Sequence, residues 1–404
     1  MFKLTLCWLL AAAALTGCSA AQRAAVDVRT GWADVYATEA PDGPTAIGPR
    51  ATELEAALRT AMDRKTHAGA EGDARLAQVA NWLAERVSVG DSPQLQRRLA
   101  VTTRAGVPFP TPAIVSVRFT PGIDSARLTQ AVADQVQKLG GTAVYVRYGI
   151  AVHATAGEHF AIAVLTAADV DFSAVPRHAS VGDALELEGS LTGRLQHPRL
   201  AVTMPDGKTE NQEASGRSFD FRIALANRGA YAVELLGDGT LGPLVVANFP
   251  VYVDAPEPAL PVEQAVERVT SPAASEAELF ALVNGERAKL GLRPLVLWPA
   301  LAAVARAHSQ DMVEHGYVAH VSPTQGTTEN RVDRAGIPWQ RLGENVGMAS
   351  TTMEVHQGLM ASPGHREAIV NPAFTHVGIG VALQVQGDGY VPVVTEVFVT
   401  PPQK

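Results

Sequence analysis

The period of the hydrophobic pattern changes twice along the 404 residues, and this change limits the fold more than any other feature. Apolar side chains recur at helical spacing between residues 52 and 90, alternate every second residue from about 178 to 253, and return to helical spacing after 275. A chain of this length is expected to form two or three domains. The pattern therefore predicts a multidomain α+β protein.

The central stretch, residues 176–253, contains about seven short alternating runs separated by turn signals such as Pro205-Asp206-Gly207. This spacing is typical of a small Ig-like β-sandwich. Its segment Gly237–Gly242 satisfies G-x-G-x-x-G, but no helix follows it, so it predicts a hairpin loop and not a dinucleotide site. Residues 254–274 contain four prolines and are interpreted as a Pro/Ala-rich linker.

The first residues have the character of a targeting segment. One positive charge at Lys3 precedes an apolar run of about a dozen residues, which is too short to span a bilayer. The sequence Leu15-Thr16-Gly17-Cys18 then resembles the lipobox of bacterial lipoproteins. The resemblance implies a signal peptide over residues 1–17 and acylation of Cys18. The Pro and Gly residues that follow indicate a tether with a short strand over residues 18–50. The alternative is a plain signal peptide cut near Ala20.

The lipobox resemblance also implies a location and a partner. The protein is expected in the bacterial cell envelope, extracytoplasmic and held to a membrane by its N-terminal lipid. Ser19 is not the acidic residue that retains some lipoproteins at the inner membrane, which favours the outer membrane. A net charge of -8 without a run of Lys and Arg argues against nucleic acid as a partner.

Six short motifs occur in a fixed order in the last 130 residues. They are Leu282-Val283-Asn284-Gly285-Glu286-Arg287, Ala307-His308-Ser309-Gln310-Asp311-Met312, His320-Val321-Ser322-Pro323, Gly343-Glu344-Asn345-Val346, Ser362-Pro363-Gly364-His365-Arg366 and Val377-Gly378-Ile379-Gly380-Val381 with Thr395-Glu396-Val397-Phe398. In this order they resemble the CAP superfamily (SCP-like; cysteine-rich secretory, venom allergen and pathogenesis-related proteins) in its disulfide-free bacterial form. The resemblance implies an α-β-α sandwich over residues 275–404. A capping box formed by Ser275 and Glu278 predicts the start of its first helix.

The resemblance further implies two histidines and two glutamates in a central cleft. His320, Glu344 and His365 match three of these positions, whereas Ser362 stands where the second glutamate is expected. Two imidazoles and a carboxylate suit a divalent metal such as zinc, with His320, His365 and Glu344 as ligands. The alternative is a buried hydrogen-bond network. His308 lies on an apolar helical stripe and is predicted to be a core residue.

These features predict a lipid-anchored cell-envelope protein whose CAP domain binds a ligand, such as a lipid, glycan or protein, together with a divalent metal in the cleft. No reaction and no catalytic residue are assigned, because Ser362 is a poor general base. One alternative is a metal-dependent hydrolase or peptidase that uses His320, His365 and Glu344. The other is a non-catalytic envelope scaffold or adhesion protein.

Residues 51–175 are predicted to form an α+β domain that repeats the C-terminal fold in degenerate form. Short matches at offsets of 225 to 230 carry this interpretation: Leu76–Ala80 with Leu301–Ala305, Ala105–Phe109 with Ala335–Trp339, Gly149–Val152 with Gly378–Val381, and Thr166 with Thr395. At these offsets Glu344 corresponds to Ile114, His365 to Val136, and His320 falls near Gln94, so the site is absent from the first copy. The alternative is an unrelated α/β spacer whose motifs match by chance.

Overall fold

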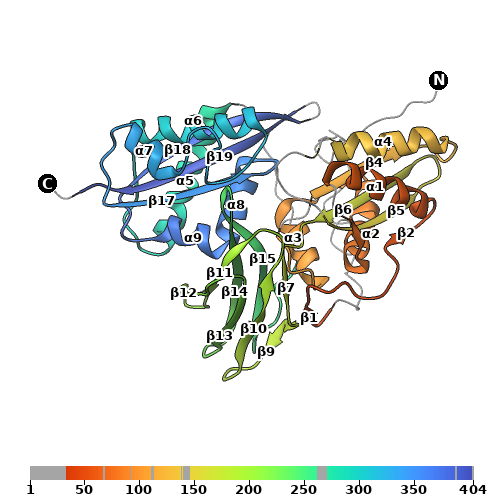
Figure 1. Ribbon diagram of the computed structural model, residues 1–404, viewed down its shortest axis with the longest axis horizontal. Helices are drawn as coiled ribbons and strands as arrows, with labels where there is room; N and C mark the ends of the chain where they lie inside the picture. The colour runs from red at the N-terminus through yellow and green to blue at the C-terminus, as the bar shows by residue number, and fades with distance from the viewer. Residues whose placement is uncertain are drawn as a thin grey trace, which may run out of the picture.

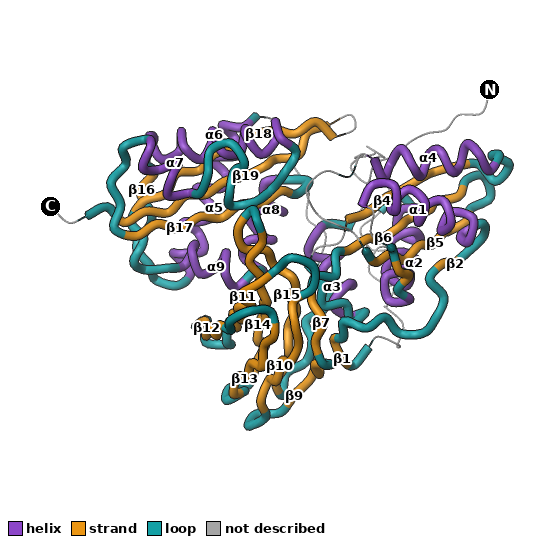
Figure 2. The backbone as a smooth tube through the Cα atoms, viewed as in Figure 1, coloured by secondary structure: helices purple, strands orange, loops and turns teal. Residues whose placement is uncertain are grey.

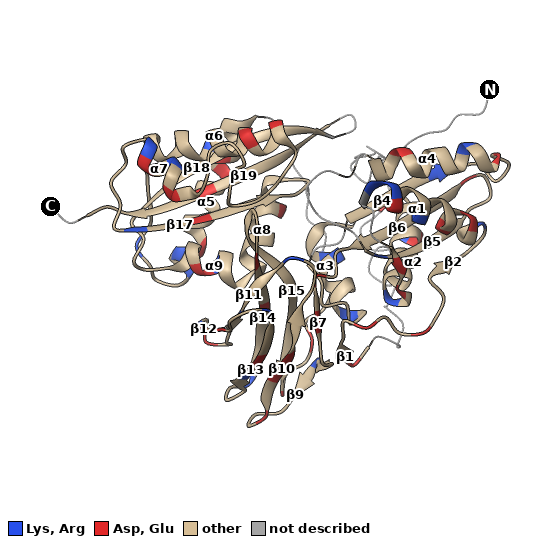
Figure 3. Cartoon of the chain, viewed as in Figure 1, with Lys and Arg blue, Asp and Glu red and all other residues tan. Residues whose placement is uncertain are grey.

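The computed structural model describes residues 33–402 except 67–68, 92, 111–112, 138, 140–145, 262–270 and 387–388. The predicted signal peptide, Cys18 and residues 262–270 of the predicted linker lie outside these residues. Figure 1 shows two mixed α/β domains on either side of an all-β domain. Among the described residues, no helix combines the length and apolar character needed to cross a membrane. Figure 3 shows acidic and basic residues interspersed along the backbone of all three domains.

The first domain is a sheet covered by helices on both faces. Its strands run in the order β2-β5-β6-β4, with β3 also paired to β5. Helices α1 and α4 pack on one face through side chains such as Leu58 and Leu128, and α2 and α3 pack on the other through Leu83 and Val101. Its elements are β1 (Val35–Tyr36), β2 (Ala46–Ile47), α1 (Ala51–Thr66), β3 (Glu71–Gly72), α2 (Ala74–Ser88), α3 (Leu95–Arg104), β4 (Ala113–Phe119), α4 (Ser125–Gln137), β5 (Arg147–Ala154) and β6 (His159–Thr166).

The central domain consists of two sheets packed face to face, with strand orders β13-β10-β7 and β12-β11-β14-β15-β9. Along β13, Phe219, Phe221 and Ile223 are buried and the intervening residues are exposed, as expected for a half-buried strand. Gly239 pairs with Gly242 at the end of a long hairpin, which confirms the predicted hairpin loop. The elements are β7 (Val170–Phe172), β8 (Val175–Pro176), β9 (His178–Ala179), β10 (Ala184–Leu191), β11 (Gln196–Thr203), β12 (Thr209–Glu213), β13 (Ser218–Ala224), β14 (Gly229–Gly239) and β15 (Gly242–Val253).

The core of this β-sandwich continues into the first domain. Tyr36 of β1 lies between them, with its ring 4.4 Å from that of Phe249 on β15. The same buried cluster includes Leu76 and Leu83 of α2 and Phe221 of β13. Apolar burial therefore joins the first two domains, in contrast to the polar contacts between the sandwich and the C-terminal domain described below.

The C-terminal domain has the three layers that the CAP resemblance implies (Figure 2). Its strand order is β16-β18-β19-β17. Helices α6 and α7 pack on one face through Leu301 and Val332, and α5, α8 and α9 pack on the other through Val283, Leu359 and Ile369. Its elements are α5 (Pro272–Lys289), β16 (Val296–Leu297), α6 (Pro299–His315), α7 (Thr328–Arg334), β17 (Arg341–Met348), α8 (Thr352–Ala361), α9 (Pro363–Val370), β18 (His376–Gln386) and β19 (Gly389–Thr400).

The first helix of this domain begins earlier than predicted. Ser271 is its N-cap and accepts a hydrogen bond from the Ala274 amide, while Pro272 takes the first helical position, where its missing N–H costs nothing. Ser275, the predicted cap, is buried inside the helix and its hydroxyl accepts a hydrogen bond from Thr352 of α8. The prediction was wrong because the preceding Ser-Pro pair is the stronger start signal.

The two mixed domains have the same ladder register. Gly72 pairs in parallel with Tyr148 as Leu297 does with Val377, and Ile114 pairs with Val164 as Glu344 does with Val397. The predicted match of Thr166 with Thr395 is wrong. Thr166 pairs with Arg147, and the residue that pairs with His376, the equivalent of Arg147, is Val399. Four more residues separate His376 from Val399 than separate Arg147 from Thr166. The numbering offset between the two domains therefore increases from 229 on the first strand of the hairpin to 233 on the second.

Glycines at equivalent places let a helix backbone approach the sheet. A Cβ on Gly149 would lie 2.2 Å from the Leu76 carbonyl carbon, and one on Gly378 would lie 2.3 Å from that of Leu301. These glycines set the distance of α2 and α6 from their sheets, because any side chain there would meet rigid backbone.

We expect Gly378→Ala to destabilise the chain by about 1–3 kcal/mol or more, because the added methyl group displaces α6 from the sheet. Chemical denaturation followed by circular dichroism measures the effect. Gly285→Ala is the matched control: the position is in the exposed interior of α5 with nothing within 4 Å of the new Cβ, so helix propensity predicts a gain of roughly 0.5–1 kcal/mol. Equal midpoints for the two variants would contradict the close-approach argument.

Candidate functional site

The structure brings together the four residues that the resemblance placed in a cleft, and the group His320, Glu344, Ser362 and His365 is called the cleft from here on. His320 lies on the loop after α6, Glu344 lies on β17, and Ser362 and His365 lie at the start of α9. The two imidazole rings are nearly parallel, with centroids 6.1 Å apart. Each ring has its Nδ1 atom within hydrogen-bond distance of another member of the set: 3.1 Å from Glu344 Oε1 for His320 and 2.7 Å from Ser362 Oγ for His365.

Glu344 holds His320 in place and is itself held by Arg331 of α7. The Arg331 Nη2 group donates to Glu344 Oε2 at 2.5 Å, and its Nη1 group donates to the backbone oxygen of His320. Burial raises the pKa of Glu344, but the hydrogen bond from His320 and the charge of Arg331 outweigh burial and keep that pKa below its ordinary value. The ionised carboxylate can only accept, so His320 Nδ1 carries a proton and donates it to this hydrogen bond.

His365 is held from the other side of the cleft. Its ring contacts the hydroxyl of Ser362, the N-cap residue of α9. That hydroxyl donates in turn to Glu234 of β14, whose other carboxylate oxygen accepts from the Gly364 amide at 2.9 Å. Burial lowers the pKa of His365 to about 4, so the ring is neutral at physiological pH.

The β-sandwich packs directly against this cleft. The ends of β11 and β14 contact α9, as Figure 1 shows beneath the C-terminal domain. The hairpin loop of the sandwich also reaches His320: the Val321 amide donates to the Leu241 carbonyl at 3.0 Å, and a Cβ on Gly242 would lie 3.2 Å from the His320 Cβ. The four predicted residues therefore lie at a junction between two domains.

A third carboxylate, Glu396 of β19, is fully buried beneath the cleft. Asn345 donates from its Nδ2 atom to Glu396 Oε2 and to the backbone oxygen of His365, each at 3.1 Å. Among the residues that the structure describes, Glu396 Oε1 has no hydrogen-bond partner. Burial raises the pKa of Glu396 to about 7, and the hydrogen bond from Asn345 opposes this only in part.

His308 lies in the core, as predicted. It is fully buried, and its Nε2 atom lies 2.9 Å from the Ala319 backbone oxygen. This contact fixes the segment that leads to His320, so His308 supports the cleft without entering it.

Sequence reasoning did not nominate Arg331, Glu234 or Glu396. The sequence could have indicated Glu396, because it is a single acidic residue within the apolar run of β19, and a buried acidic residue is unusual. Arg331 lies on a short helix among other charged residues, and Glu234 lies 128 residues before Ser362 in another domain. No local pattern distinguishes these two from surface residues.

The hydrogen bonds already made by His320, His365 and Glu344 limit which of their atoms could bind a divalent metal. No cluster of three or more His, Cys, Asp or Glu side chains in the described part of the chain is arranged to hold a metal ion. Both oxygens of Glu344 are engaged, by His320 and by Arg331. A metal would therefore take the imidazoles of His320 and His365, with Glu344 behind His320 as the carboxylate that orients the ring.

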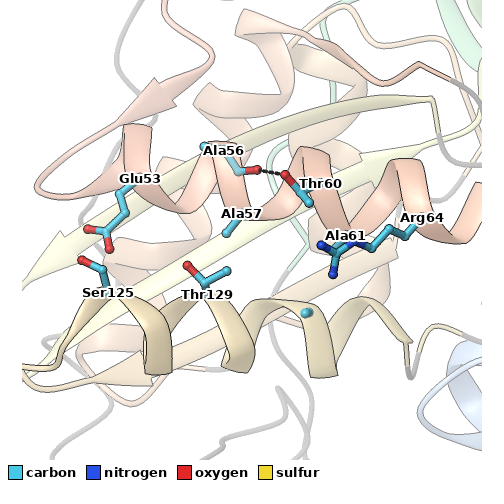
Figure 4. A pocket seen from close by; sticks show the side chains of 9 residues that line it. Glu53, Ala56, Ala57, Thr60, Ala61, Arg64, Ser125 and Thr129 are labelled. Carbon is cyan, nitrogen blue, oxygen red and sulfur yellow. Dashed lines mark hydrogen bonds between the residues drawn. The ribbon is translucent and has the colours of Figure 1, made fainter.

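A separate groove of about 330 Å³ lies in the first domain, between α1 and α4. Figure 4 shows Glu53 and Ser125 at one end and Arg64 at the other, with small side chains between them. None of the residues predicted for the cleft lines this groove.

Comparison with known proteins points to the C-terminal domain. Residues 280–399 match the model of the Cysteine-rich secretory protein family (CAP). The uncharacterized protein YkwD of Bacillus subtilis is 42% identical over 112 residues, covering 28% of this chain and 44% of the relative. The uncharacterized membrane protein YlbC of the same organism is 36% identical over 113 residues, covering 26% of this chain and 31% of the relative. The chain thus spans less than half the length of either relative.

Two solved structures are also similar. An extracellular SCP-domain protein from Bacillus anthracis is 23% identical, with 45% of this chain and 63% of that chain covered and a TM-score of 0.29. An outer surface protein from Borrelia burgdorferi is 19% identical, with coverage of 32% and 94% and a TM-score of 0.29.

We expect Glu396→Gln to remove a pH dependence of stability. The folded chain holds the Glu396 proton more tightly than the unfolded chain, so the contribution of this group is present below about pH 4.5 and lost as the pH rises to about 7. The free energy of unfolding of the wild type should fall relative to the variant over this range, by about 3 kcal/mol at most.

Denaturant unfolding of both proteins at several pH values measures this difference. Glu314→Gln, at an exposed position of α6, serves as the control and should track the wild type. A difference between wild type and Glu396→Gln that stays constant from pH 4.5 to 7 would show that Glu396 does not titrate there.

Proposed function

We propose, on the premise that residues 280–399 form a CAP domain of the bacterial type, that this chain is a lipid-anchored protein of the bacterial cell envelope whose CAP domain binds a ligand between His320 and His365. A divalent metal such as zinc is the simplest ligand for this pair. The description of two structural neighbours as extracellular or outer-surface proteins supports the location. The lipobox resemblance of Leu15–Cys18 supports the anchor and, with Ser19, favours the outer membrane.

The observation that carries this proposal is the way in which the two imidazoles are held. The Nδ1 atom of each ring is engaged, with Glu344 for His320 and with Ser362 for His365. Among the hydrogen bonds of the described residues, neither Nε2 atom takes part. Two oriented rings 6.1 Å apart, each with one uncommitted nitrogen, provide ligands for one shared cation or for a molecule with suitable donors.

The same geometry favours binding over hydrolysis. A hydrolase needs a carboxylate free to act as a general base near the bound water. Glu344 is engaged by His320 and Arg331, and Ser362 replaces the glutamate that the family resemblance implies. The assignment is therefore a binding module without an assigned reaction.

For the first domain we propose a degenerate CAP-like repeat without a site. The shared ladder register and the equivalent helix-to-glycine contacts support this. The position equivalent to Glu344 is the apolar Ile114, and the His365 offset leads to Val136, which is buried in the core. The domain then acts with the Ig-like sandwich as a spacer that supports the C-terminal domain.

We expect the chain lacking its signal peptide to bind zinc with one-to-one stoichiometry, and the double variant His320→Ala/His365→Ala to lose this binding. Isothermal titration calorimetry measures it. The matched control is His153→Ala, on β5 of the first domain, which should bind as the wild type does. Absence of binding in the wild type, or retention in the folded double variant, would exclude the two-histidine metal site.

We expect Cys18→Ser to abolish lipid attachment and to move the protein from the membrane fraction to the aqueous fraction. Acylation of the cysteine at this position is what the lipobox resemblance implies, and the acyl chains supply the membrane affinity. Incorporation of labelled palmitate measures the effect. Cys7→Ser changes the other cysteine, within the signal peptide, and should leave labelling intact. Labelling that persists in Cys18→Ser would contradict the anchor.

A further inference from the structure

One carboxylate of the central domain reaches into the cleft of the C-terminal domain. Glu234 lies on β14 between Val233 and Leu235, whose side chains fill the sandwich core. Successive residues of a strand point to opposite faces, so Glu234 points out of the sandwich. An outward glutamate is normally exposed, yet Glu234 is fully buried. The start of α9 covers it, through Ser362 and Gly364.

The hydrogen bonds around Glu234 determine which nitrogen of His365 carries the proton. The Gly364 amide donates to Glu234 Oε1. The Ser362 hydroxyl donates to Oε2, which also accepts a longer hydrogen bond of 3.4 Å from Asn248 Nδ2 of β15. A hydroxyl has only one proton to donate. Burial raises the pKa of Glu234, and the hydrogen bonds from Ser362 and Gly364 oppose this by favouring the ionised form. With the carboxylate ionised, Ser362 gives it that proton, and the serine oxygen accepts from His365 Nδ1 across the 2.7 Å contact. In the neutral ring, Nε2 is then the unprotonated nitrogen.

We propose that Glu234 is a positioning residue of the cleft: through Ser362 it fixes the tautomer of His365 that leaves Nε2 free to bind. This deepens the proposed function and rests on it for the identity of the bound partner. The CAP resemblance implies a glutamate at position 362, and here the carboxylate comes from the neighbouring domain and acts through a serine. The binding site is thus built from two domains.

Other contacts between the C-terminal domain and the two preceding domains do not involve Glu234. The Val321 amide donates a hydrogen bond to the Leu241 carbonyl, and the Arg366 guanidinium donates to the Gly207 backbone oxygen. The Leu95 amide of the first domain donates to the Glu354 carboxylate. These contacts hold the domains together independently. A variant at Glu234 can therefore separate positioning of His365 from adhesion between domains.

The test is Glu234→Gln in the full chain without its signal peptide, with the protonation of His365 read by NMR on ¹⁵N-histidine-labelled, metal-free protein. The glutamine must turn its oxygen to the Gly364 amide, because that donor is backbone and cannot rotate. Its NH₂ group then faces Ser362, whose hydroxyl turns to donate to His365 Nδ1. The proton of His365 is expected to move to Nε2, and the affinity for zinc is expected to fall about 10-fold or more.

Two further variants complete the design. Ser362→Ala removes the link while leaving the Gly364 contact to Glu234, and it should cause the same change at His365. In Glu234→Gln/Ser362→Asp a carboxylate returns at position 362, next to His365 Nδ1, and aspartate is also a good N-cap. This double variant should restore the Nδ1-protonated ring. Glu188→Gln, at an exposed position of β10, is the control.

Each outcome has a separate meaning. A His365 tautomer that is unchanged in folded Glu234→Gln and Ser362→Ala overturns the positioning role. A change of tautomer that the double variant reverses supports it, and a parallel loss of zinc affinity supports the two-domain site. A wild type that binds no zinc but shows the change of tautomer overturns the proposed metal site and leaves the role of Glu234 standing.

Discussion

A carboxylate that is removed from water must be hydrogen-bonded or neutralised, and this requirement arranges the cleft. Glu344, Glu234 and Glu396 are all fully or almost fully buried. Each meets the requirement differently. A guanidinium and an imidazole bind Glu344 and keep its pKa low. Glu234 accepts from a hydroxyl, a backbone amide and the Asn248 side chain, and burial still raises its pKa. Glu396 accepts from a single side-chain amide, and burial raises its pKa to about 7. The groups that satisfy Glu344 and Glu234 lead directly to His320 and His365, so the two rings are oriented by the cost of burying charge.

Much of the fold could be predicted because its signals are local. The alternation along β13 and the Pro299 and Gly316 boundaries of α6 depend only on neighbouring residues. The contacts between domains could not be predicted in this way. In the sequence, Glu234 has the pattern of a polar residue on the solvent-facing side of a strand. It contacts the cleft only because tertiary packing places α9 over it. Likewise, the offset at β19 depended on a hairpin length that no short motif records.

The two mixed domains show why a fold and a site can be separated in one chain. Helices α2 and α6 can pack closely on their sheets only if a glycine lies at the point of closest approach. Gly149 and Gly378 occupy these two positions. The layers do not depend on the identity of the residue at the Glu344 position, since Ile114 occupies the same ladder register in the first domain. Polar residues at the Glu344 position are not needed for the packing that defines the fold, so they can be lost while that packing is kept.

The contact between Glu234 and Ser362 requires the sandwich and the C-terminal domain to keep a fixed relative position. A hydrogen bond from Ser362 to Glu234 orients His365 only while β14 and α9 keep their separation, because such bonds weaken steeply with distance and angle. The contacts of Val321 with Leu241 and of Glu354 with Leu95 tie the C-terminal domain to the sandwich and to the first domain at once. Because an apolar core joins those two domains to each other, they act together as one support. Both N-terminal domains thus help to hold α8 and α9, the first through Leu95 and Glu354 and the sandwich through Glu234 and Gly364.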